Sequence, residues 1–391
     1  MSIALERLRG TLQRGGSTQL GIGPISVECV DATIDLANSL RVPLMLIASR
    51  RQIDSAACGG GYVNGWTTEK FAEYVRERDK GGFIVLCRDH GGPWQNYSEV
   101  ENHMSLEDAM KSAKESFTVD IESGFDIVHL DPSIDLHNEG LSQQQIIDRL
   151  FDVYVHCMDN SARCGKDISI EVGTEEQSGV NQDMEVFNEM LKRTGEFCAA
   201  QKYPRPLFVV AQTGTLVKET SNIGTFDAPF RLNGSIPAEI QVPTLVETCR
   251  RQGIFLKEHN GDYLSNEALL WHRRMGIDAT NIAPEFGVGQ TRYILRICQE
   301  FGLTHEEDKL IEIAYTSGKW KKWILPDSTA TDRDRAIIAG HYVYSDEEFV
   351  HVKERIRETC KKKGFDFDAG QREAIKMMIM RIMACFGLYN N

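Results

Sequence analysis

The sequence predicts an α/β protein, a (β/α)8 TIM barrel with a C-terminal helical extension. Three observations support this fold class. Eight short apolar runs rich in Val, Ile and Leu recur over the first three-quarters of the chain, longer segments with helical periodicity separate them, and the last quarter contains helical patterns alone. Nearly continuous apolar strands that alternate with helices are typical of a parallel sheet covered on its outside. A doubly wound open sheet is the structural alternative, because the first and last runs are short.

The eight expected strands share short length, apolar composition and a polar residue close behind. They cover residues 20–24, 43–48, 83–87, 127–130, 168–172, 207–211, 254–256 and 281–283. Two of the intervening helices have recognisable starts. Ser105 precedes Asp108 and Ser142 precedes Gln145 by three residues, a spacing that indicates capping boxes.

The periodicity divides the chain into a barrel over residues 1–290 and a helical extension over residues 291–391. Within the extension, residues 347–363 and 371–385 have the charged amphipathic pattern of helices. Trp320 and Trp323 stand in a Lys-Trp-Lys-Lys-Trp segment. A core role is expected for both tryptophans, and anchoring of the extension to the barrel or to another subunit is the alternative.

Composition excludes several classes of function. The chain has 57 acidic residues against 44 Lys and Arg, a net charge of -13, and no dense basic run. This balance argues against a nucleic-acid or anionic-membrane partner, and no apolar stretch is long enough to span a bilayer. The amino terminus lacks the apolar stretch of a signal peptide, so a cytoplasmic protein is expected. The ten cysteines occur singly, without a Cys-x-x-Cys pair, which predicts reduced thiols.

Polar residues follow most of the expected strands. Chemistry in such a barrel lies at the carboxyl ends of the strands. Asp89 and His90 follow the third run, Glu171 and Glu175 close the fifth, and His259 follows the seventh. Their convergence predicts a divalent-metal site with Asp89 as an adjacent carboxylate, since imidazole and carboxylate suit zinc, manganese or iron. Alternatively, each His caps its own strand through a backbone hydrogen bond.

Three other features have less specific interpretations. His129 lies two residues before Asp131 and therefore on the same side of its strand, where we expect a core residue or a support for the ligands. The Gly-rich segment 59–65 is either a lid or a plain flexible loop. Gly287 and Gly289 stand where a helix opens, and backbone N–H groups there could hold an anion.

The motifs at the strand ends resemble a known family. They are Asp89-His-Gly-Gly-Pro93, His129-Leu-Asp-Pro-Ser133, Gly173-Thr-Glu175, Val210-Ala-Gln-Thr-Gly214 and Glu258-His-Asn-Gly-Asp-Tyr263. In this order they are similar to motifs of the Z-type subunits of class II D-tagatose-1,6-bisphosphate aldolase. The resemblance implies a class II aldolase barrel, a zinc-type metal and phosphorylated sugar substrates.

The same resemblance assigns roles by position. His90 and His259 become metal ligands and Asp89 becomes the acid/base. The position of the third histidine ligand holds Gln212, and a neutral amide oxygen is a poorer zinc ligand than imidazole. Z-type subunits share this departure and are commonly regarded as non-catalytic partners of the true aldolase subunit. Glu171 occupies the place of a functional glutamate, so a mixed site of His90, Glu171 or Glu175, and His259 is the chemically consistent alternative.

The resulting hypothesis is a metal-dependent class II aldolase-like enzyme that acts on a tagatose-bisphosphate-like ketose. Retro-aldol cleavage would pass through a metal-stabilised enediolate, with Asp89 taking the proton of the hydroxyl at the cleaved bond. The alternatives are a non-catalytic subunit that stabilises a separate catalytic aldolase chain, a metal-dependent sugar epimerase, and a sugar-binding module without chemistry. A homo-oligomer is the other partner state considered.

Cationic and polar residues near the strand ends complete the predicted substrate site. Arg50, Arg51, Arg88 and Lys257 would neutralise a phosphate or carboxylate, and their neutralisation is expected to raise the Michaelis constant before it affects stability. Ordinary salt bridges at the barrel mouth are the alternative for these four. The remaining predicted contacts with substrate are Asp131, Asn260, Asp262, Gly287 and Gly289.

Overall fold

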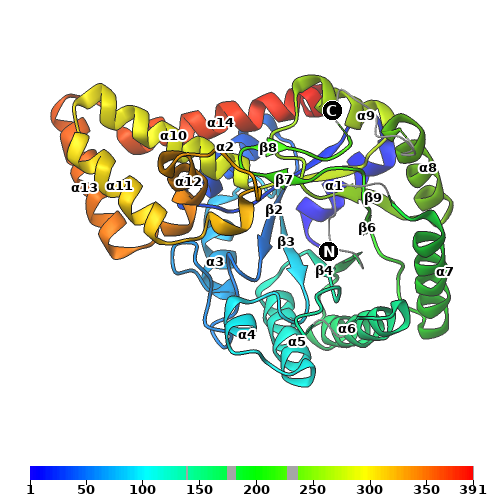
Figure 1. Cartoon of the computed structure of the whole chain (residues 1–391). Coiled ribbons are helices and arrows are strands. Elements are labelled where there is room, and N and C mark those ends of the chain that lie inside the picture. The colour runs from blue at the N-terminus through cyan, green and yellow to red at the C-terminus, as the bar shows by residue number, and fades with distance from the viewer. Residues whose placement is uncertain (138–139, 174–181, 227–236, 391) are drawn as a thin grey trace.

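Eight parallel strands close into a barrel, which confirms the predicted fold class. The computed structural model describes residues 1–137, 140–173, 182–226 and 237–390 (Figure 1). Within these residues the strand order is β1-β10-β9-β6-β5-β4-β3-β2, and β1 pairs with both β10 and β2. A doubly wound sheet would have two unpaired edges, so closure excludes that alternative.

The barrel strands are β1 (Gln19–Ile22), β2 (Leu44–Ser49), β3 (Ile84–Gly91), β4 (Ile127–Leu130), β5 (Ser169–Val172), β6 (Phe208–Val210), β9 (Phe255–Glu258) and β10 (Ala279–Ile282). Each overlaps a predicted run. The largest difference is in β3, which continues to Gly91 and whose pairing with β4 shifts between Arg88 and Gly91. Asp89 and His90 therefore belong to the strand itself, at an irregularity that turns their side chains toward the barrel mouth.

Helices surround the barrel as the periodicity predicted (Figure 1). Those of the barrel region are α1 (Ile3–Arg14), α2 (Val27–Leu40), α3 (Thr68–Arg78), α4 (Tyr97–Glu101), α5 (Leu106–Ser123), α6 (Gln143–Cys164), α7 (Met184–Gln201), α8 (Ala238–Arg251), α9 (Asn266–Met275) and α10 (Pro284–Phe301). Ser142 and Gln145 form the full predicted capping box, whereas Ser105 caps α5 by accepting from the Asp108 backbone N–H while its own hydroxyl bonds to the Asp108 carboxylate.

The interior of the barrel is closed at its amino end by α1. Leu5 and Leu8 of this helix are fully or nearly fully buried, and they belong to one apolar cluster with inward-facing strand residues such as Val85 and Phe208. Because this end is filled by apolar side chains, the polar residues at the carboxyl end remain the accessible face of the barrel.

The C-terminal extension departs from the barrel and then returns to it (Figure 1). Its helices are α11 (Thr304–Thr316), α12 (Asp332–Ala339), α13 (Glu347–Lys362) and α14 (Phe367–Phe386), with short 3-10 turns at Lys321–Trp323 and Gly340–Val343. Helices α11 to α13 share an apolar core with α10, whereas Ile375, Ile379 and Ile382 of α14 belong to the apolar cluster of the barrel. The predicted boundary at residue 290 falls inside α10.

Two further predictions concern the chain as a whole. All ten cysteines are free thiols, as their scattered spacing predicted. Among the described residues, no helix has both the length and the apolar character that crossing a bilayer requires.

Candidate active site

Two carboxylates and two imidazoles from four strands converge at the carboxyl end of the barrel. Asp89 comes from β3, His129 from β4 and Glu171 from β5, and His259 follows β9 directly. Their ligand atoms lie within 4.8 Å of one another. His259 Nε2 is 3.0 Å from Glu171 Oε1 and 3.6 Å from Asp89 Oδ1. His129 Nδ1 is 3.8 Å from the same Glu171 oxygen. The structure thus brings three predicted site residues together and adds a fourth.

His90 approaches this cluster from the side of the cavity. Its backbone has a positive φ of 45°, an unusual conformation for a non-glycine residue. Its Nδ1 lies 2.7 Å from Asp131 Oδ2, and its Nε2 lies 3.2 Å from His259 Nδ1. A carboxylate that holds one imidazole nitrogen orients the other nitrogen toward a metal. Asp131, which was predicted to contact substrate, therefore acts on His90 as well as lining the cavity.

His129 is the site residue that the sequence interpretation placed too far from the chemistry. The strand alternation put it on the side of Asp131, but one strand does not reveal which side faces inward. The structure decides this: His129 is 1 % exposed, stands in register with Glu171, and accepts a hydrogen bond at Nδ1 from the His90 backbone N–H. Its Nε2 is buried without a hydrogen-bond partner among the described residues.

Electrostatics keeps two of the imidazoles neutral. Burial lowers the pKa of both His129 and His259 to about 3. Burial also opposes the charged form of His90, but Asp89 and Asp131 outweigh it and raise its pKa to about 9. Neutral imidazole nitrogens together with carboxylate oxygens form the donor set that zinc, manganese and iron accept. The ligand atoms of Asp89, His129, Glu171 and His259 lie within 4.8 Å of one another, so the residues fit a divalent metal.

A cavity of about 390 Å³ opens beside this cluster. Asp89 and His90 line it, together with the predicted residues Arg51, Asp131 and Asn260. The C-terminal extension supplies part of its wall, which the division into a barrel and an appendage did not foresee. The extension residues that line the cavity are Lys322, Trp323, His341 and Tyr342.

Three of the four predicted anion-binding cations do not reach this cavity. Arg50 is fully buried, with Nε 2.9 Å from Asp54 and one terminal nitrogen 2.7 Å from Glu99. Arg88 is bound through two nitrogens to Asp120, at 2.8 and 2.6 Å. Buried carboxylates neutralise both arginines inside the protein. Arg50 and Arg88 therefore form ordinary salt bridges, which was the alternative to substrate binding.

Lys257 also serves a neighbouring carboxylate. Its Nζ lies 2.7 Å from Glu171 Oε2, and both side chains are 1 % exposed. Burial disfavours the lysine charge, but Glu171 outweighs this effect and the pKa of Lys257 is raised. Lys257 is therefore paired with Glu171 inside the barrel and does not line the cavity, and this contact replaces the expectation that it meets an anionic substrate.

The glycines after the eighth strand do not form an anion site. Gly287 and Gly289 lie inside α10, where an added Cβ would come within 2.5 Å of the His341 ring and 2.4 Å of Met378. They permit the extension to pack closely. The helix N-terminus is already occupied, because Asp262 Oδ1 accepts hydrogen bonds from the backbone N–H groups of Ala283 and Glu285.

Two predicted ligands have a different status. Gln212 is buried directly after β6, and its backbone N–H donates to Gln182 at 2.8 Å. Its side chain as a ligand remains a prediction. Glu175 lies outside the described residues. Asn281 was not predicted, yet its amide donates to Asp89 Oδ1 at 3.0 Å. The sequence feature that could have indicated this role is the position of Asn281, a polar residue in the last predicted strand.

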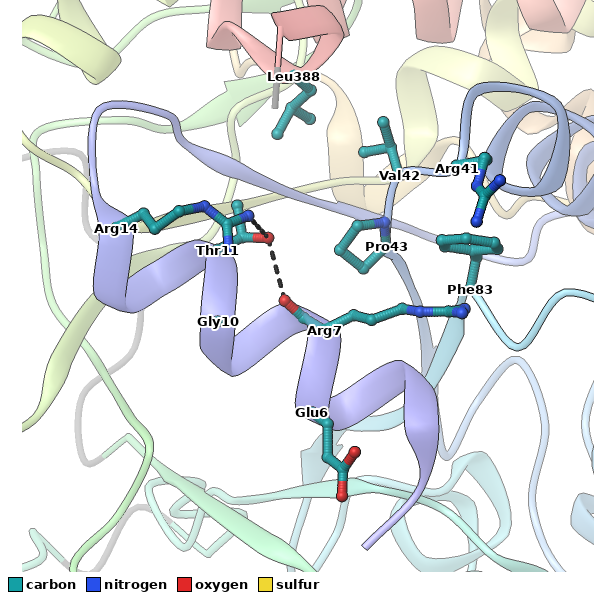
Figure 2. A pocket seen from close by; sticks show the side chains of 10 residues that line it. All are labelled: Glu6, Arg7, Gly10, Thr11, Arg14, Arg41, Val42, Pro43, Phe83 and Leu388. Atoms are coloured by element: carbon teal, nitrogen blue, oxygen red, sulfur yellow. Dashed lines mark hydrogen bonds between the residues drawn. The ribbon is translucent and has the colours of Figure 1, made fainter.

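A second cavity, of about 430 Å³, lies at the opposite end of the barrel (Figure 2). Pro43 and Phe83, which precede β2 and β3, line it together with Arg7 of α1. The Arg7 guanidinium stands 3.8 Å over the Phe83 ring and donates to the carbonyls of Gly81 and Gly82. Arg7 is committed to these contacts, and Glu6 is the one carboxylate among the lining residues. Because no imidazole stands beside it there, we place the chemistry at the carboxyl end.

Comparison with known proteins shows the fold. No family model and no curated protein sequence matches the chain. The chain shares its fold with solved aldolases and an epimerase. A probable tagatose 6 phosphate kinase from Sinorhizobium meliloti is 16 % identical, with a TM-score of 0.73 over 94 % of this chain and 100 % of that one.

Two further solved structures share the barrel. The fructuronate-tagaturonate epimerase from Cohnella laeviribosi is 11 % identical, with a TM-score of 0.61 over 95 % of this chain and 81 % of that one. The fructose-bisphosphate aldolase from Campylobacter jejuni is 11 % identical, with a TM-score of 0.57 over 99 % and 95 %. At these identities the likeness establishes the fold, and the site has to be argued from its own residues.

Proposed function

We propose that the chain is a metal-dependent class II aldolase-like enzyme that cleaves and forms a carbon–carbon bond in a ketose sugar phosphate of the tagatose-bisphosphate type. One observation carries the proposal. His129, Glu171 and His259 converge with Asp89 so that their ligand atoms lie within 4.8 Å of one another, which supports a metal site without a histidine at position 212. Gln212 is the main argument for a non-catalytic subunit, and His129 supports the enzyme alternative because it offers an imidazole elsewhere in the site.

The metal ligands proposed are His90, His129, His259 and Glu171, with zinc as the first candidate ion. His90 presents Nε2 to the cavity because Asp131 holds its Nδ1. A bound divalent cation would supply Lewis acidity for the negative charge that develops on the ketose carbonyl and its neighbouring hydroxyl. Gln212 and Glu175 remain proposed supplementary site residues.

Asp89 is the proposed acid/base. Its side chain lines the cavity, and Asn281 fixes Oδ1 through a 3.0 Å hydrogen bond, which leaves its other oxygen for a substrate hydroxyl. That carboxylate would take the hydroxyl proton as the adjacent carbon–carbon bond breaks and return it in the reverse reaction. Asp131 and Asn260 line the same cavity and would position the hydroxyl groups.

Metal content and aldol cleavage test this proposal together. The purified chain is expected to bind zinc at micromolar concentration, and His129→Gln is expected to weaken binding at least about tenfold. His156→Gln, on the outer helix α6, is the matched control and should bind as the original chain does. Asp89→Asn should retain the metal and lose cleavage of tagatose 1,6-bisphosphate. A chain that binds no divalent metal would overturn the proposal.

Two alternatives are outcomes of the same assay. A non-catalytic subunit, which the Z-type motifs favour, predicts no cleavage by the isolated chain and restored activity of a separate aldolase subunit. An epimerase predicts a product of unchanged carbon number. Asp89 and Glu171 both face His259 Nε2. This convergence favours aldol chemistry over an epimerase with two bases on opposite faces of the substrate.

We further propose a cytoplasmic location, which suits ten free thiols.

A further inference from the structure

We infer that the C-terminal extension provides an oxyanion subsite in the catalytic cavity, in which Lys322 and Arg51 bind a terminal phosphate or carboxylate of the substrate. The inference rests on the proposed function and identifies the residues that bind the anionic end of the substrate. Lys322 and Arg51 line the same cavity as Asp89 and His90. One cation comes from the extension and the other follows β2, so the subsite exists only when the two parts are packed together.

A third cation lies close to these two. Lys319 Nζ stands 4.2 Å from the centre of the Tyr97 ring, and Arg51 Cζ stands 5.3 Å from the centre of the same ring. Both positive groups therefore converge on one aromatic side chain of the cavity wall. Lys319 of the extension and Arg51 of the barrel therefore lie close to each other on the Tyr97 ring.

Contacts with the barrel hold the Lys322 segment in place. The Trp323 carbonyl accepts a hydrogen bond from the Glu219 N–H, and the Lys322 carbonyl accepts one from Lys218 Nζ. Lys218 and Glu219 belong to the short hairpin of β7 (Val217–Lys218) and β8 (Ser221–Asn222), which follows β6. The Lys322 backbone is thus fixed against a loop of the catalytic face.

The Lys322 side chain packs against two aromatic rings. Its Nζ lies 4.5 Å from the Trp323 ring centre and 5.3 Å from the Tyr342 ring centre. Trp323 Nε1 donates to the Tyr342 hydroxyl at 3.1 Å, and the Tyr342 ring packs 4.9 Å from Tyr62 of the Gly-rich loop. This arrangement explains the two-tryptophan motif in part, because Trp323 supports a cationic group at the cavity.

The positive charges of this subsite lack neutralising partners. Within the described residues, no ion pair joins Arg51, Lys319 or Lys322 to a carboxylate, and Arg51 Nε is buried without a hydrogen-bond partner. Arg50 and Arg88, in contrast, each have buried acidic partners. A buried unpaired donor destabilises the protein unless a ligand completes it, so an oxyanion bound here would complete the buried Nε of Arg51.

The electrostatics of Lys322 agrees with this interpretation. Lys322 is exposed at the edge of the cavity, where partial desolvation and the charges of Arg51, Lys319 and Lys218 lower its pKa to about 7. Crowding of cations costs free energy in the empty site. An anion bound between the cations would replace their mutual repulsion with attraction to the anion. Anion-binding sites in proteins gain affinity in this way.

Binding of two probes to the full-length, zinc-loaded protein tests the inference. Inorganic phosphate and acetate are titrated by calorimetry, and the tighter probe identifies a phosphate or a carboxylate as the natural group. Lys322→Met and Arg51→Met should each weaken the tighter probe at least about tenfold, whereas Lys322→Arg should retain most affinity. Lys321→Met, next to Lys322 but outside the cavity lining, is the matched control and should bind normally.

Zinc content separates this inference from the proposed function. Lys322→Met should keep its zinc, because Lys322 has no contact with the ligands. The His129→Gln protein should lose zinc and should still bind the anion, because Arg51 and Lys322 are unchanged in it. If Lys322→Met unfolds, Lys322→Gln and Arg51→Met provide the same readout. Anion affinity that is equal in the original chain, in both cavity variants and in Lys321→Met would overturn the subsite.

Discussion

Lys257 and Glu171 form a buried ion pair of 2.7 Å whose carboxylate also faces His259 through its second oxygen. The pair links the barrel interior to the candidate metal centre. Breaking it by Lys257→Met leaves an uncompensated buried charge, so we expect the free energy of unfolding to fall by about 3–5 kcal/mol. Urea denaturation measures this change.

The double variant Lys257→Met/Glu171→Gln is the control for that experiment. It removes both charges together and should recover most of the lost stability. A Lys257→Met protein as stable as the original chain would show that the ion pair does not stabilise the fold.

Arg88 and Arg51 should respond to neutralisation in opposite ways. Arg88 is buried on two bonds to Asp120, so Arg88→Met should destabilise the fold by about 3–5 kcal/mol. Arg51 has no acidic partner within the described residues, so Arg51→Met should change stability by about 0–1 kcal/mol and act on substrate affinity instead. Thermal unfolding and the Michaelis constant, measured side by side, check both. Equal destabilisation of the two variants would contradict this distinction.

Gly173 should be required for the metal site. A Cβ at this position would lie 2.6 Å from His129 Nε2, closer than real contacts allow. Gly173→Ala should therefore displace the His129 ring and weaken zinc binding at least about tenfold while the barrel stays folded. Zinc titration with a competing chelator measures the affinity, and circular dichroism checks the fold.

Gly10→Ala is the matched control, because its Cβ would meet only the Arg14 side chain at 3.5 Å within α1. It should leave zinc affinity unchanged and raise stability by about 0.5–1 kcal/mol through its helix propensity. Zinc binding by Gly173→Ala as tight as by Gly10→Ala would remove His129 from the proposed ligand set.

Anion affinity should fall as pH rises through about 7. The pKa of Lys322 is lowered from 10.5 to about 7, so the folded protein loses this positive charge well below the pH at which the unfolded chain loses it. Sulfate is the suitable probe, since its charge does not change in this range. Calorimetric titrations from pH 6 to 8.5 measure the profile.

Lys322→Arg should flatten this profile, because arginine stays charged throughout. The same shift predicts a stability effect of opposite direction. The depressed pKa means that protonated Lys322 opposes folding, so the free energy of unfolding should rise with pH from 7 toward 10.5 and do so less in Lys322→Met. A sulfate affinity independent of pH in the original chain would contradict the assignment of the low pKa.

The candidate site could be predicted where a motif coincided with the end of a strand. Asp89, His90 and His259 follow apolar runs, and parallel strands in a barrel deliver their carboxyl ends to one mouth, so chain order implied proximity. His129 could not be assigned in this way. It lies inside a strand, and alternation indicates that two residues share a face without indicating which face is inward.

The cations illustrate the same limit. Arg50, Arg51 and Arg88 look alike in the sequence, each at or near the end of a strand. Their different roles depend on Asp54, Glu99 and Asp120, which come from other elements and reach Arg50 and Arg88 but not Arg51. Charge compensation is a property of three-dimensional neighbours, so no reading of local sequence separates a buried ion pair from a substrate-binding cation.

The sequence by itself determined the barrel, since the period of its apolar runs admits few architectures. It also determined the capping of α6, the free thiols and the identity of three residues at the candidate metal site, because each depends on local chemistry or on strand order. Only the tertiary structure decided that His129 lies beside Asp89, Glu171 and His259 and that the extension lines the cavity. Both depend on long-range packing: β4 pairs in register with β5, and the hairpin of β7 and β8 holds Lys322 and Trp323 near the barrel mouth.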